Sequence, residues 1–276
     1  MTNEQAKKML KAKLELWQGD CLELMNNIPD GSVDLVLTDP PYGTTACKWD
    51  SVIPFEPMWE QLNRIIKPNG AICLFGSEPF SSALRMSNIQ NYKYDWIWQK
   101  SNVMGFLNAK KRPLKETENV SVFNSKVYYP QGLVKNEKGK NSRGKQTETL
   151  GKYEPINKSE YKNYPRTILQ FKSERGSHPT QKPVALLEYL IRTYTNEGET
   201  VLDFTAGSMS TVIACINTNR NCIAIEKDKH YFSVGCERVH KHILDNNIDL
   251  CYNQVCGGVC LWQSSKTEQV KDMVGF

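Results

Sequence analysis

The feature that most constrains the fold is a short aliphatic run that ends in an acid, two prolines and a tyrosine. Residues 33–38 (VDLVLT) are typical of a buried strand, and Asp39, Pro40, Pro41 and Tyr42 follow directly. Because proline has no backbone N–H, this pair interrupts a strand and leaves its carbonyls with few local donors. The strand end would present a carboxylate, a fixed carbonyl and an aromatic ring, which suits an amino group on a flat ring. The simpler alternative is a strand-ending turn with a capping acid.

A second unit lies near the C-terminal end of the sequence. Residues 201–204 form an apolar strand, a loop of small residues follows, and a helix then leads to a strand that ends at Glu226. The small residues Ala206, Gly207 and Ser208 allow a ligand to approach the backbone closely at a helix N-terminus. Glu226 lies 19 residues beyond Gly207, close to the offset of about 20 residues at which an acid reaches ribose hydroxyls. No Walker lysine follows the loop, so a nucleoside triphosphate site is not predicted.

Length and composition favour one large α/β domain with an insertion, or two smaller domains. The chain has 276 residues, and 39% of them are hydrophobic, which is enough for a substantial core. No apolar run approaches the length of a transmembrane helix. Residues 1–13 are polar and lysine-bearing, which predicts a short helix and not a signal peptide. We therefore expect a soluble cytoplasmic protein with no membrane partner.

Nine cysteines are an odd number, and several lie in or near apolar elements. We expect reduced thiols, and no disulfide framework, at Cys21, Cys47, Cys73, Cys215 and Cys222. A separate set near the C-terminus has the residue types of a zinc site: His240, His242, Cys251, Cys256 and Cys260. Its spacing is not that of a standard zinc knuckle, so partly exposed thiols and no bound metal are expected there.

Positive charge is concentrated in one part of the chain. From Lys100 to Arg175 there are 17 Lys and Arg, 7 Glu and no Asp, although the whole chain carries only +5. A basic segment on an acidic body is expected for a protein with a polyanionic partner, whereas a solvated lysine-rich loop is the simpler alternative. Residues 126–175 are also poor in aliphatic side chains, which indicates an inserted recognition segment or a disordered one.

The hydrophobic periodicity predicts alternating strands and helices. The predicted strands are 14–17, 33–38, 71–75, 92–99, 120–123, 201–204 and 222–226. The predicted helices are 21–28, 55–66, 79–86, 184–194, 211–217 and 230–244. From these we divide the chain into a catalytic half (1–125), a target-recognition insertion (126–175), a cofactor-binding half (176–248) and a C-terminal tail (249–276).

Three motifs occur in a fixed order: DPPY at 39–42, HPTQKP at 178–183 and DFTAGS at 203–208. With this order the chain resembles the beta group of S-adenosylmethionine-dependent DNA amino-methyltransferases, over roughly residues 14–245. The resemblance implies a Rossmann-like, doubly wound sheet of seven mostly parallel strands with one antiparallel strand. It also implies that the strands before Asp39 and Asp203 lie side by side, so that both motifs open at one edge of the sheet.

The resemblance implies a role for each motif. The first motif consists of Asp39, Pro40, Pro41 and Tyr42. Asp39 and the Pro40 carbonyl would accept hydrogen bonds from an adenine amine, and Tyr42 would stack on the base. Residues expected beside S-adenosylmethionine are Asp20, Asp39, Thr180, Lys182, Asp203, Phe204, Ala206, Gly207, Ser208 and Glu226. For Asp20 a simple turn acid, and for Phe204 a core side chain, are the alternatives. Residues expected on double-stranded DNA are Lys110, Lys111, Arg112, Arg143 and Lys145.

One residue departs from the family pattern. The loop of the family reads Gly-Ser-Gly, whereas this chain has Gly207, Ser208 and Met209. If the second glycine serves a positive φ or a close backbone approach, methionine would obstruct cofactor binding.

The resemblance leads to one function with several alternatives. An acid before the two prolines usually accompanies adenine, and serine accompanies cytosine N4, so Asp39 predicts an adenine-specific, site-specific DNA methyltransferase. The alternatives are methylation of cytosine N4, an RNA or protein amide substrate, and a non-catalytic DNA-binding protein that lost the cofactor through Met209. A homodimer and a cognate restriction endonuclease are further partners that the family admits.

Overall fold

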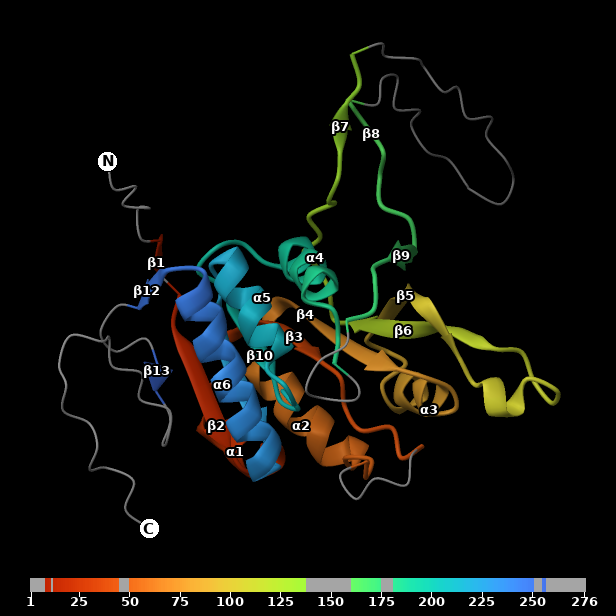
Figure 1. Ribbon diagram of the computed structural model, residues 1–276, viewed down its shortest axis with the longest axis horizontal. Helices are drawn as coiled ribbons and strands as arrows, with labels where there is room; N and C mark the ends of the chain where they lie inside the picture. The colour runs from red at the N-terminus through yellow and green to blue at the C-terminus, as the bar shows by residue number, and fades with distance from the viewer. Residues whose placement is uncertain are drawn as a thin grey trace.

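A mixed β-sheet forms the centre of the computed structural model. The structure describes residues 8–10, 12–44, 50–137, 160–174, 181–250 and 255–256. Within these residues the sheet has nine strands in the order β13-β2-β11-β10-β3-β4-β6-β5-β9 (Figure 1). In chain order they are β2 (Leu14–Gln18), β3 (Val33–Thr38), β4 (Ile66–Gly76), β5 (Tyr92–Met104), β6 (Lys115–Phe123), β9 (Ile168–Gln170), β10 (Thr200–Asp203), β11 (Asn221–Glu226) and β13 (Val255–Cys256).

Strand β6 runs antiparallel to both of its neighbours, and every other pairing in this sheet is parallel. The mostly parallel, doubly wound fold is thus confirmed. The strand count differs from the prediction of seven, because the short strands β9 and β13 extend the two edges of the sheet. Neither has the length or apolar periodicity that identifies a strand in a sequence.

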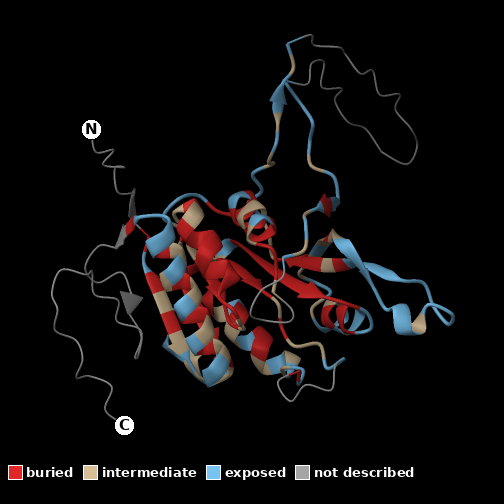
Figure 2. Cartoon of the chain, in the orientation of Figure 1, coloured by how far each residue is buried: buried red, intermediate tan, exposed pale blue. Residues whose placement is uncertain are grey.

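Helices cover both faces of the sheet. On one face α4 (Val184–Tyr194), α5 (Ser210–Thr218) and α6 (Lys229–Asp245) pack in one core cluster. The other face is covered by α1 (Cys21–Leu24), the 3-10 turn η1 (Met25–Asn27), α2 (Phe55–Ile65) and α3 (Phe80–Ser87). Adjacent residues of the central strands enter opposite clusters, such as Leu35 and Val36, and buried residues line both faces (Figure 2). Burial on both faces explains the continuous aliphatic runs in the sequence.

The chain reverses its direction of travel across the sheet between β3 and β10. From β3 it passes through α2 to β4, which pairs with β3, while from β10 it passes through α5 to β11 on the opposite side. Strands β3 and β10 pair in parallel, Val201 with Leu35 and Leu202 with Val36. Ligands bind outside the carboxyl ends of strands at such a switch point, and Asp39 and Asp203 both lie there.

Helix α4 is anchored to the sheet by a group of aromatic side chains. The Tyr194 hydroxyl accepts a hydrogen bond from Trp96 Nε1 at 2.7 Å and lies 2.9 Å from the Tyr94 hydroxyl. Tyr94 and Trp96 follow the period-2 alternation of β5, which places both side chains on the face that α4 covers. This contact fixes the helix that follows Lys182.

The remaining elements are small. Strand β7 (Val134–Lys135) pairs with β8 (Tyr161–Lys162) in an arm that projects from the body, and η2 (Phe106–Asn108) lies at the β5–β6 turn (Figure 1). Strand β1 (Lys8–Leu10) pairs with β12 (Ile248–Leu250). The prediction of a helix over residues 1–13 is therefore wrong at 8–10, because pairing with a strand 240 residues away overrides local preference.

Two further predictions can be compared with the described residues. Cys21, Cys73, Cys215 and Cys222 are buried free thiols, as expected, and Cys236 is a fifth; Cys47 lies outside the described residues. Within the described part of the chain, no helix is long and apolar enough to cross a membrane.

Met209 occupies a left-handed position but is packed in the core. Its φ is 61°, and its fully buried side chain lies against helix α6. A Cβ at Gly235 of α6 would lie 2.4 Å from Cγ of Met209 and 3.0 Å from the Gly207 carbonyl oxygen. The missing side chain of Gly235 thus provides the space that Met209 fills. The methionine side chain points into the core, so it does not obstruct the loop as the sequence suggested.

We predict that Gly235→Ala lowers the free energy of unfolding by about 1–3 kcal/mol, the usual cost of overpacking. In an exposed helix the same change would stabilise by up to about 1 kcal/mol. In a Met209→Ala background the loss should be smaller, because the Cγ is absent. Urea denaturation of the four proteins of this cycle measures the coupling. An equal loss of unfolding free energy on Gly235→Ala in both backgrounds would contradict this packing of Met209 against α6. Glu237→Ala, on the exposed side of α6, is the control.

Candidate functional site

A buried carboxylate, Asp203, and a half-buried one, Asp39, meet at the carboxyl edge of β3 and β10. The Thr38 hydroxyl donates to the Asp203 carboxylate at 2.6 Å and lies 2.6 Å from the Thr205 hydroxyl, which in turn donates to the Asp39 carbonyl oxygen at 3.0 Å. Thr211 Oγ1 donates to the second oxygen of Asp203 at 2.5 Å. These hydroxyls join the first and third motifs into one rigid edge.

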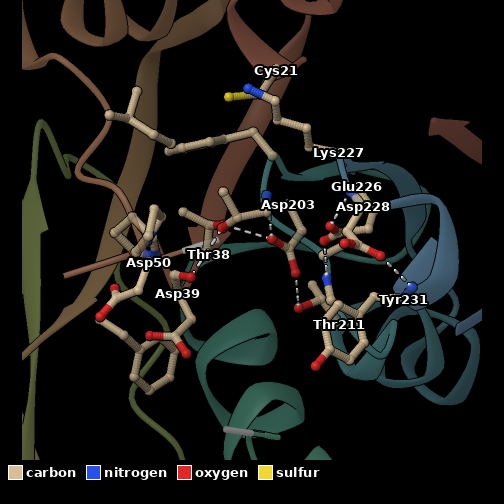
Figure 3. Close-up of a pocket in the computed structure, with 18 of the residues that line it drawn as sticks. Cys21, Thr38, Asp39, Asp50, Asp203, Thr211, Glu226, Lys227, Asp228 and Tyr231 are labelled. Carbon is tan, nitrogen blue, oxygen red and sulfur yellow. Dashed lines mark hydrogen bonds between the residues drawn. The ribbon is translucent and has the colours of Figure 1, made fainter. Parts of the chain in front are cut away.

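A cavity of about 760 Å³ opens over this edge (Figure 3), within the size range of small-molecule sites. Nine of the ten predicted cofactor residues line it: Asp20, Asp39, Lys182, Asp203, Phe204, Ala206, Gly207, Ser208 and Glu226. The tenth, Thr180, lies outside the described residues. The DPPY residues Pro40, Pro41 and Tyr42 line the same cavity, whereas Met209 does not. The structure thus brings the first and third motifs together around one space.

The cavity wall at β11 is built around Glu226. Its carboxylate accepts hydrogen bonds from the N–H groups of Gly207, at 2.7 Å, and Asp228, at 2.8 Å. Each oxygen uses one lone pair in this way and keeps another for a ligand. Burial raises the pKa of Glu226. The carboxylate is thus held rigidly against the small-residue loop while it faces the cavity.

Asp20 at the end of β2 combines two of the roles considered for it. Its side chain caps α1 by accepting from the Leu22 N–H at 2.9 Å, and it pairs with Lys227 at 2.9 Å. The hydrogen bond from Lys227 lowers the pKa of Asp20. Phe204 likewise belongs to the core cluster beneath the cavity and also contributes to its wall. Both residues are structural, and both border the space that a ligand would fill.

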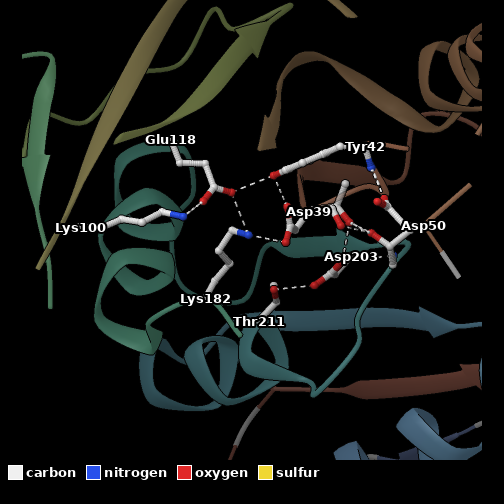
Figure 4. A network of polar contacts seen from close by, with 10 residues as sticks. Asp39, Tyr42, Asp50, Lys100, Glu118, Lys182, Asp203 and Thr211 are labelled. Atoms are coloured by element: carbon white, nitrogen blue, oxygen red, sulfur yellow. Dashed lines mark hydrogen bonds and ion pairs between the residues drawn. The ribbon is translucent and has the colours of Figure 1, made fainter. Parts of the chain in front are cut away.

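At the opposite end of the cavity, four side chains form a closed ring (Figure 4). Lys182 Nζ donates to Asp39 and, at 2.9 Å, pairs with Glu118. The Tyr42 hydroxyl also contacts both carboxylates, Asp39 and, at 2.8 Å, Glu118. Lys100 adds a second cation to Glu118 at 2.5 Å. We call Asp39, Tyr42, Glu118 and Lys182 the polar ring.

Burial and charge set the protonation of the polar ring. Burial would raise the pKa of Glu118, but Lys182 and Lys100 outweigh it and lower the pKa to about 2. Burial raises the pKa of Asp39, to which the nearby Glu118 charge adds and which Lys182 opposes. Burial lowers the pKa of Lys182, yet the two carboxylates raise it overall. Glu118 and Lys182 are therefore charged at neutral pH, and of the two carboxylates in the ring Asp39 is the one whose charge is less favoured.

Asp203 differs from Asp39 in its partners. Burial raises its pKa to about 6, although hydrogen bonds from Thr211, Thr38 and the Thr205 N–H oppose the shift. No cation pairs with it within the described residues. Asp203 is thus a hydrogen-bonded carboxylate at the cavity floor, one that a cationic ligand would stabilise.

The loop after the two prolines is fixed by Asp50. Its carboxylate accepts from the N–H groups of Tyr42 at 2.7 Å, Gly43 at 2.8 Å and Thr44 at 2.8 Å. The Tyr42 ring stacks on Phe80 with a centroid distance of 5.1 Å. One face of Tyr42 is therefore covered by protein, and its hydroxyl is held in the polar ring.

Sequence reasoning missed four side chains of this site: Thr38, Asp50, Lys100 and Glu118. Thr38 looked like the last residue of an ordinary strand. Asp50 lies eight residues after Tyr42 in a loop with no pattern of its own. Lys100 and Glu118 are distant in sequence from the first motif, and the pairing of β6 with β4 and with β5 brings them to Asp39. A glutamate that shares a buried strand with Val120 and Val122 was the one available signal.

Those predicted DNA-binding residues that the structure describes are separate from the cavity. Lys110, Lys111 and Arg112 are exposed at the turn between β5 and β6, whereas Arg143 and Lys145 lie outside the described residues. Of the candidate zinc ligands, Cys251 and Cys260 lie outside the described residues, and the side chain of Cys256 is not described.

The family model of the N6/N4 DNA methylases matches residues 33–237 of this chain. The Type II methyltransferase M.HpaI of Haemophilus parainfluenzae is 27% identical over 265 residues, covering 86% of this chain and 79% of that protein. The structure of the M1.HpyAVI–SAM complex has a TM-score of 0.56 at 26% identity, covering 82% and 99% of the two chains. The cytosine-N4-specific PvuII DNA methyltransferase, at TM-score 0.59 and 18% identity over 90% and 99%, is alike in fold alone.

Proposed function

The chain belongs to the N6/N4 DNA methylase family, and on that premise we propose that it methylates N6 of adenine in duplex DNA. It is a DNA methyltransferase that uses S-adenosylmethionine. The choice of adenine, and the residues that carry out the reaction, are our proposals. They rest above all on the position of Asp39. It lines a cavity that suits the cofactor, and it accepts hydrogen bonds from Tyr42 and Lys182 that a target amine could replace.

The cavity has the donor set that S-adenosylmethionine needs. Six carboxylates and three lysines line it, so it favours a ligand with a positive sulfonium and ammonium group. Glu226 faces the cavity with free lone pairs for ribose hydroxyls, and Gly207 allows close approach of the backbone. Asp20 and Phe204 would border the adenine, and Asp203 and Lys182 the methionine end. When bound, the cofactor supplies an electrophilic methyl group.

The chemical difficulty lies in the amine. The lone pair of an exocyclic amine is delocalised into its ring, so the nitrogen is a poor nucleophile. A carboxylate oxygen of Asp39 and the Pro40 carbonyl would each accept one amine hydrogen and draw the nitrogen toward tetrahedral geometry. Catalysis of this kind depends on positioning and electrostatics, which contribute up to about 7–11 kcal/mol when geometry is favourable. The raised pKa of Asp39 also suits it to take up the proton that the amine releases.

Asp39 must first release its present partners. Both Lys182 and the Tyr42 hydroxyl donate to it, and both also contact Glu118. A target amine that replaces them on Asp39 would leave each donor with Glu118 as a remaining acceptor, so no buried polar group loses every partner. We propose that Glu118 is a positioning residue that makes this exchange possible.

Adenine is favoured over cytosine by the acid at the first position of the DPPY motif. Family members with serine there more often act on cytosine N4, and Asp39 is the residue that approaches the amine in our account. The cytosine-N4-specific structure noted above shares the fold at 18% identity, so cytosine N4 is the second candidate.

Duplex DNA is the proposed substrate because the matching family is that of DNA methylases, and Asp39 lies in the wall of a cavity. A target inside a duplex reaches such a pocket only after it is flipped out. The basic segment from Lys100 to Arg175, with 17 basic residues and 7 acidic ones, supplies the charge for the phosphate backbone. A homodimer and a partner restriction endonuclease stay predictions.

Methyl transfer identifies the base. The protein is incubated with labelled S-adenosylmethionine and unmethylated genomic DNA, which is then digested to nucleosides. We predict label on N6-methyladenosine and a loss of about 10²–10³-fold in kcat for Asp39→Ala, the usual cost of removing a preorganised polar group. Label on N4-methylcytosine would keep the mechanism and refute the base assignment. Label that persists in Asp39→Ala would refute the role of Asp39.

Cofactor affinity tests Glu226. We expect Glu226→Gln to weaken binding of S-adenosylmethionine by about 10- to 100-fold, because hydrogen bonds to a charged group contribute about 1.5–3 kcal/mol. Isothermal titration calorimetry without DNA measures this effect directly. Glu237→Gln, on the exposed side of α6, is the matched control, and an unchanged Kd in Glu226→Gln would place the ribose elsewhere.

The pH profile tests Glu118. In Glu118→Gln the negative charge that raises the pKa of Asp39 is gone, so Asp39 ionises at lower pH and the acidic limb of kcat should move to lower pH. At neutral pH kcat should fall by about tenfold, equivalent to one pKa unit of interaction, because Lys182 then favours Asp39 and competes with the amine. A merely structural Glu118 would lower stability without moving the acidic limb, and that result would contradict the exchange.

A further inference from the structure

The β5–β6 hairpin extends beyond the sheet and ends in uncovered apolar side chains. Leu107 is fully exposed and Phe106 is 68% exposed. Val103, Met104 and Leu114 on the same hairpin are also exposed, and Figure 2 shows the outer half of the hairpin as an exposed projection. Single exposed apolar residues are common, but five within twelve residues of one projection indicate an interaction surface.

The tip of this hairpin has a defined conformation. Gly105 adopts a left-handed φ of 94°, and the turn η2 follows it. The Asn108 N–H donates to the Gly105 carbonyl at 2.9 Å, and the N–H groups of Lys111 and Arg112 donate to the Asn108 carbonyl at 2.8 and 3.0 Å. Local hydrogen bonds therefore fix the conformation of the tip that carries Phe106 and Leu107.

Charge identifies the partner. From Lys100 to Lys115 the chain has five basic residues and no acidic one. Lys110, Lys111 and Arg112 are exposed, and no described carboxylate forms an ion pair with them. A second copy of this chain would bring two such tips of like charge together, which is unfavourable. A phosphate backbone is complementary to the tip.

The position of the hairpin relative to the polar ring fits the same partner. Strand β6 carries Glu118 of the ring, and Lys115 lies three residues nearer the tip, or about 10 Å along the strand. Trp98 pairs with Glu118 and Gln99 with Thr117, and beyond a register shift Met104 pairs with Lys115, so the two strands run side by side from the ring toward the tip. A two-stranded ribbon enters a major groove about 12 Å wide.

We propose that this tip is a wedge for duplex DNA, in which Phe106 and Leu107 enter the base stack while Lys110, Lys111 and Arg112 hold adjacent phosphates. Apolar side chains inserted at base steps unstack them, and the wedge would occupy the stack near the base that leaves for the cavity. This assignment rests on the proposed action on duplex DNA, and it adds a residue set outside the cavity that the reaction needs.

The test compares three multiple variants with the wild-type protein. Phe106→Ser/Leu107→Ser removes the wedge, and Lys110→Ala/Lys111→Ala/Arg112→Ala removes the charge. Met86→Ser/Ile89→Ser removes exposed apolar side chains outside the hairpin and is the matched control. Two quantities are measured for each: steady-state methylation of genomic duplex DNA, and the linking number of a closed circular plasmid relaxed by topoisomerase with the protein bound.

We expect the wedge variant to lower kcat at least about tenfold, because the vacated stack is no longer filled. Its KM for DNA should stay within about twofold, and it should no longer unwind the plasmid. The charge variant should raise KM and flatten its dependence on salt. The control should match the wild type in every measurement.

Two results would overturn the wedge. One is a wedge variant with wild-type kcat and wild-type unwinding. The other is loss of activity together with conversion of a wild-type dimer to a monomer in light scattering, which would assign the tip to contact between copies. A wild-type protein that unwinds the plasmid but methylates no DNA would instead refute the proposed function and leave the wedge in place.

Discussion

The site depends on the parallel pairing of β3 with β10. This pairing is fixed at both ends by side chains: the Thr200 N–H donates to Asp34 at 2.9 Å, and Thr38 donates to Asp203 at 2.6 Å. Because the chain turns in opposite directions from these two strands, a cleft must open at their carboxyl ends. Motifs separated by more than 160 residues of sequence therefore border one cavity.

Charge balance explains how so many ionic groups are buried beside that cavity. Asp39 and Glu118 share Lys182, and Lys100 adds a second cation to Glu118, so two carboxylates face two ammonium groups. Removal of one partner from such a set usually costs about 3–5 kcal/mol, since it leaves a buried charge without compensation. When the substrate binds, its amine exchanges with a partner of Asp39 within this balanced set. Asp39 is the carboxylate whose charge a new donor would stabilise most.

The sequence was sufficient for the elements that carry a strong local pattern. The aliphatic strands and the helix faces follow from periodicity, and the placement of both motifs at one sheet edge follows from the family resemblance. It was insufficient where long-range pairing decides the result. The strand at Lys8–Leu10 forms only against β12, and Glu118 reaches Asp39 only because β6 runs antiparallel between β4 and β5. Met209 looked like a defect, since its compensation lies at Gly235 in another helix.

A crystal structure of the protein with duplex DNA and a non-reactive cofactor analogue tests the central claim most directly. Our account predicts that the target amine donates to the Asp39 carboxylate while Lys182 Nζ and the Tyr42 hydroxyl remain on Glu118. A flipped base whose amine lies away from Asp39, with Lys182 and Tyr42 still bound to that carboxylate, would contradict it.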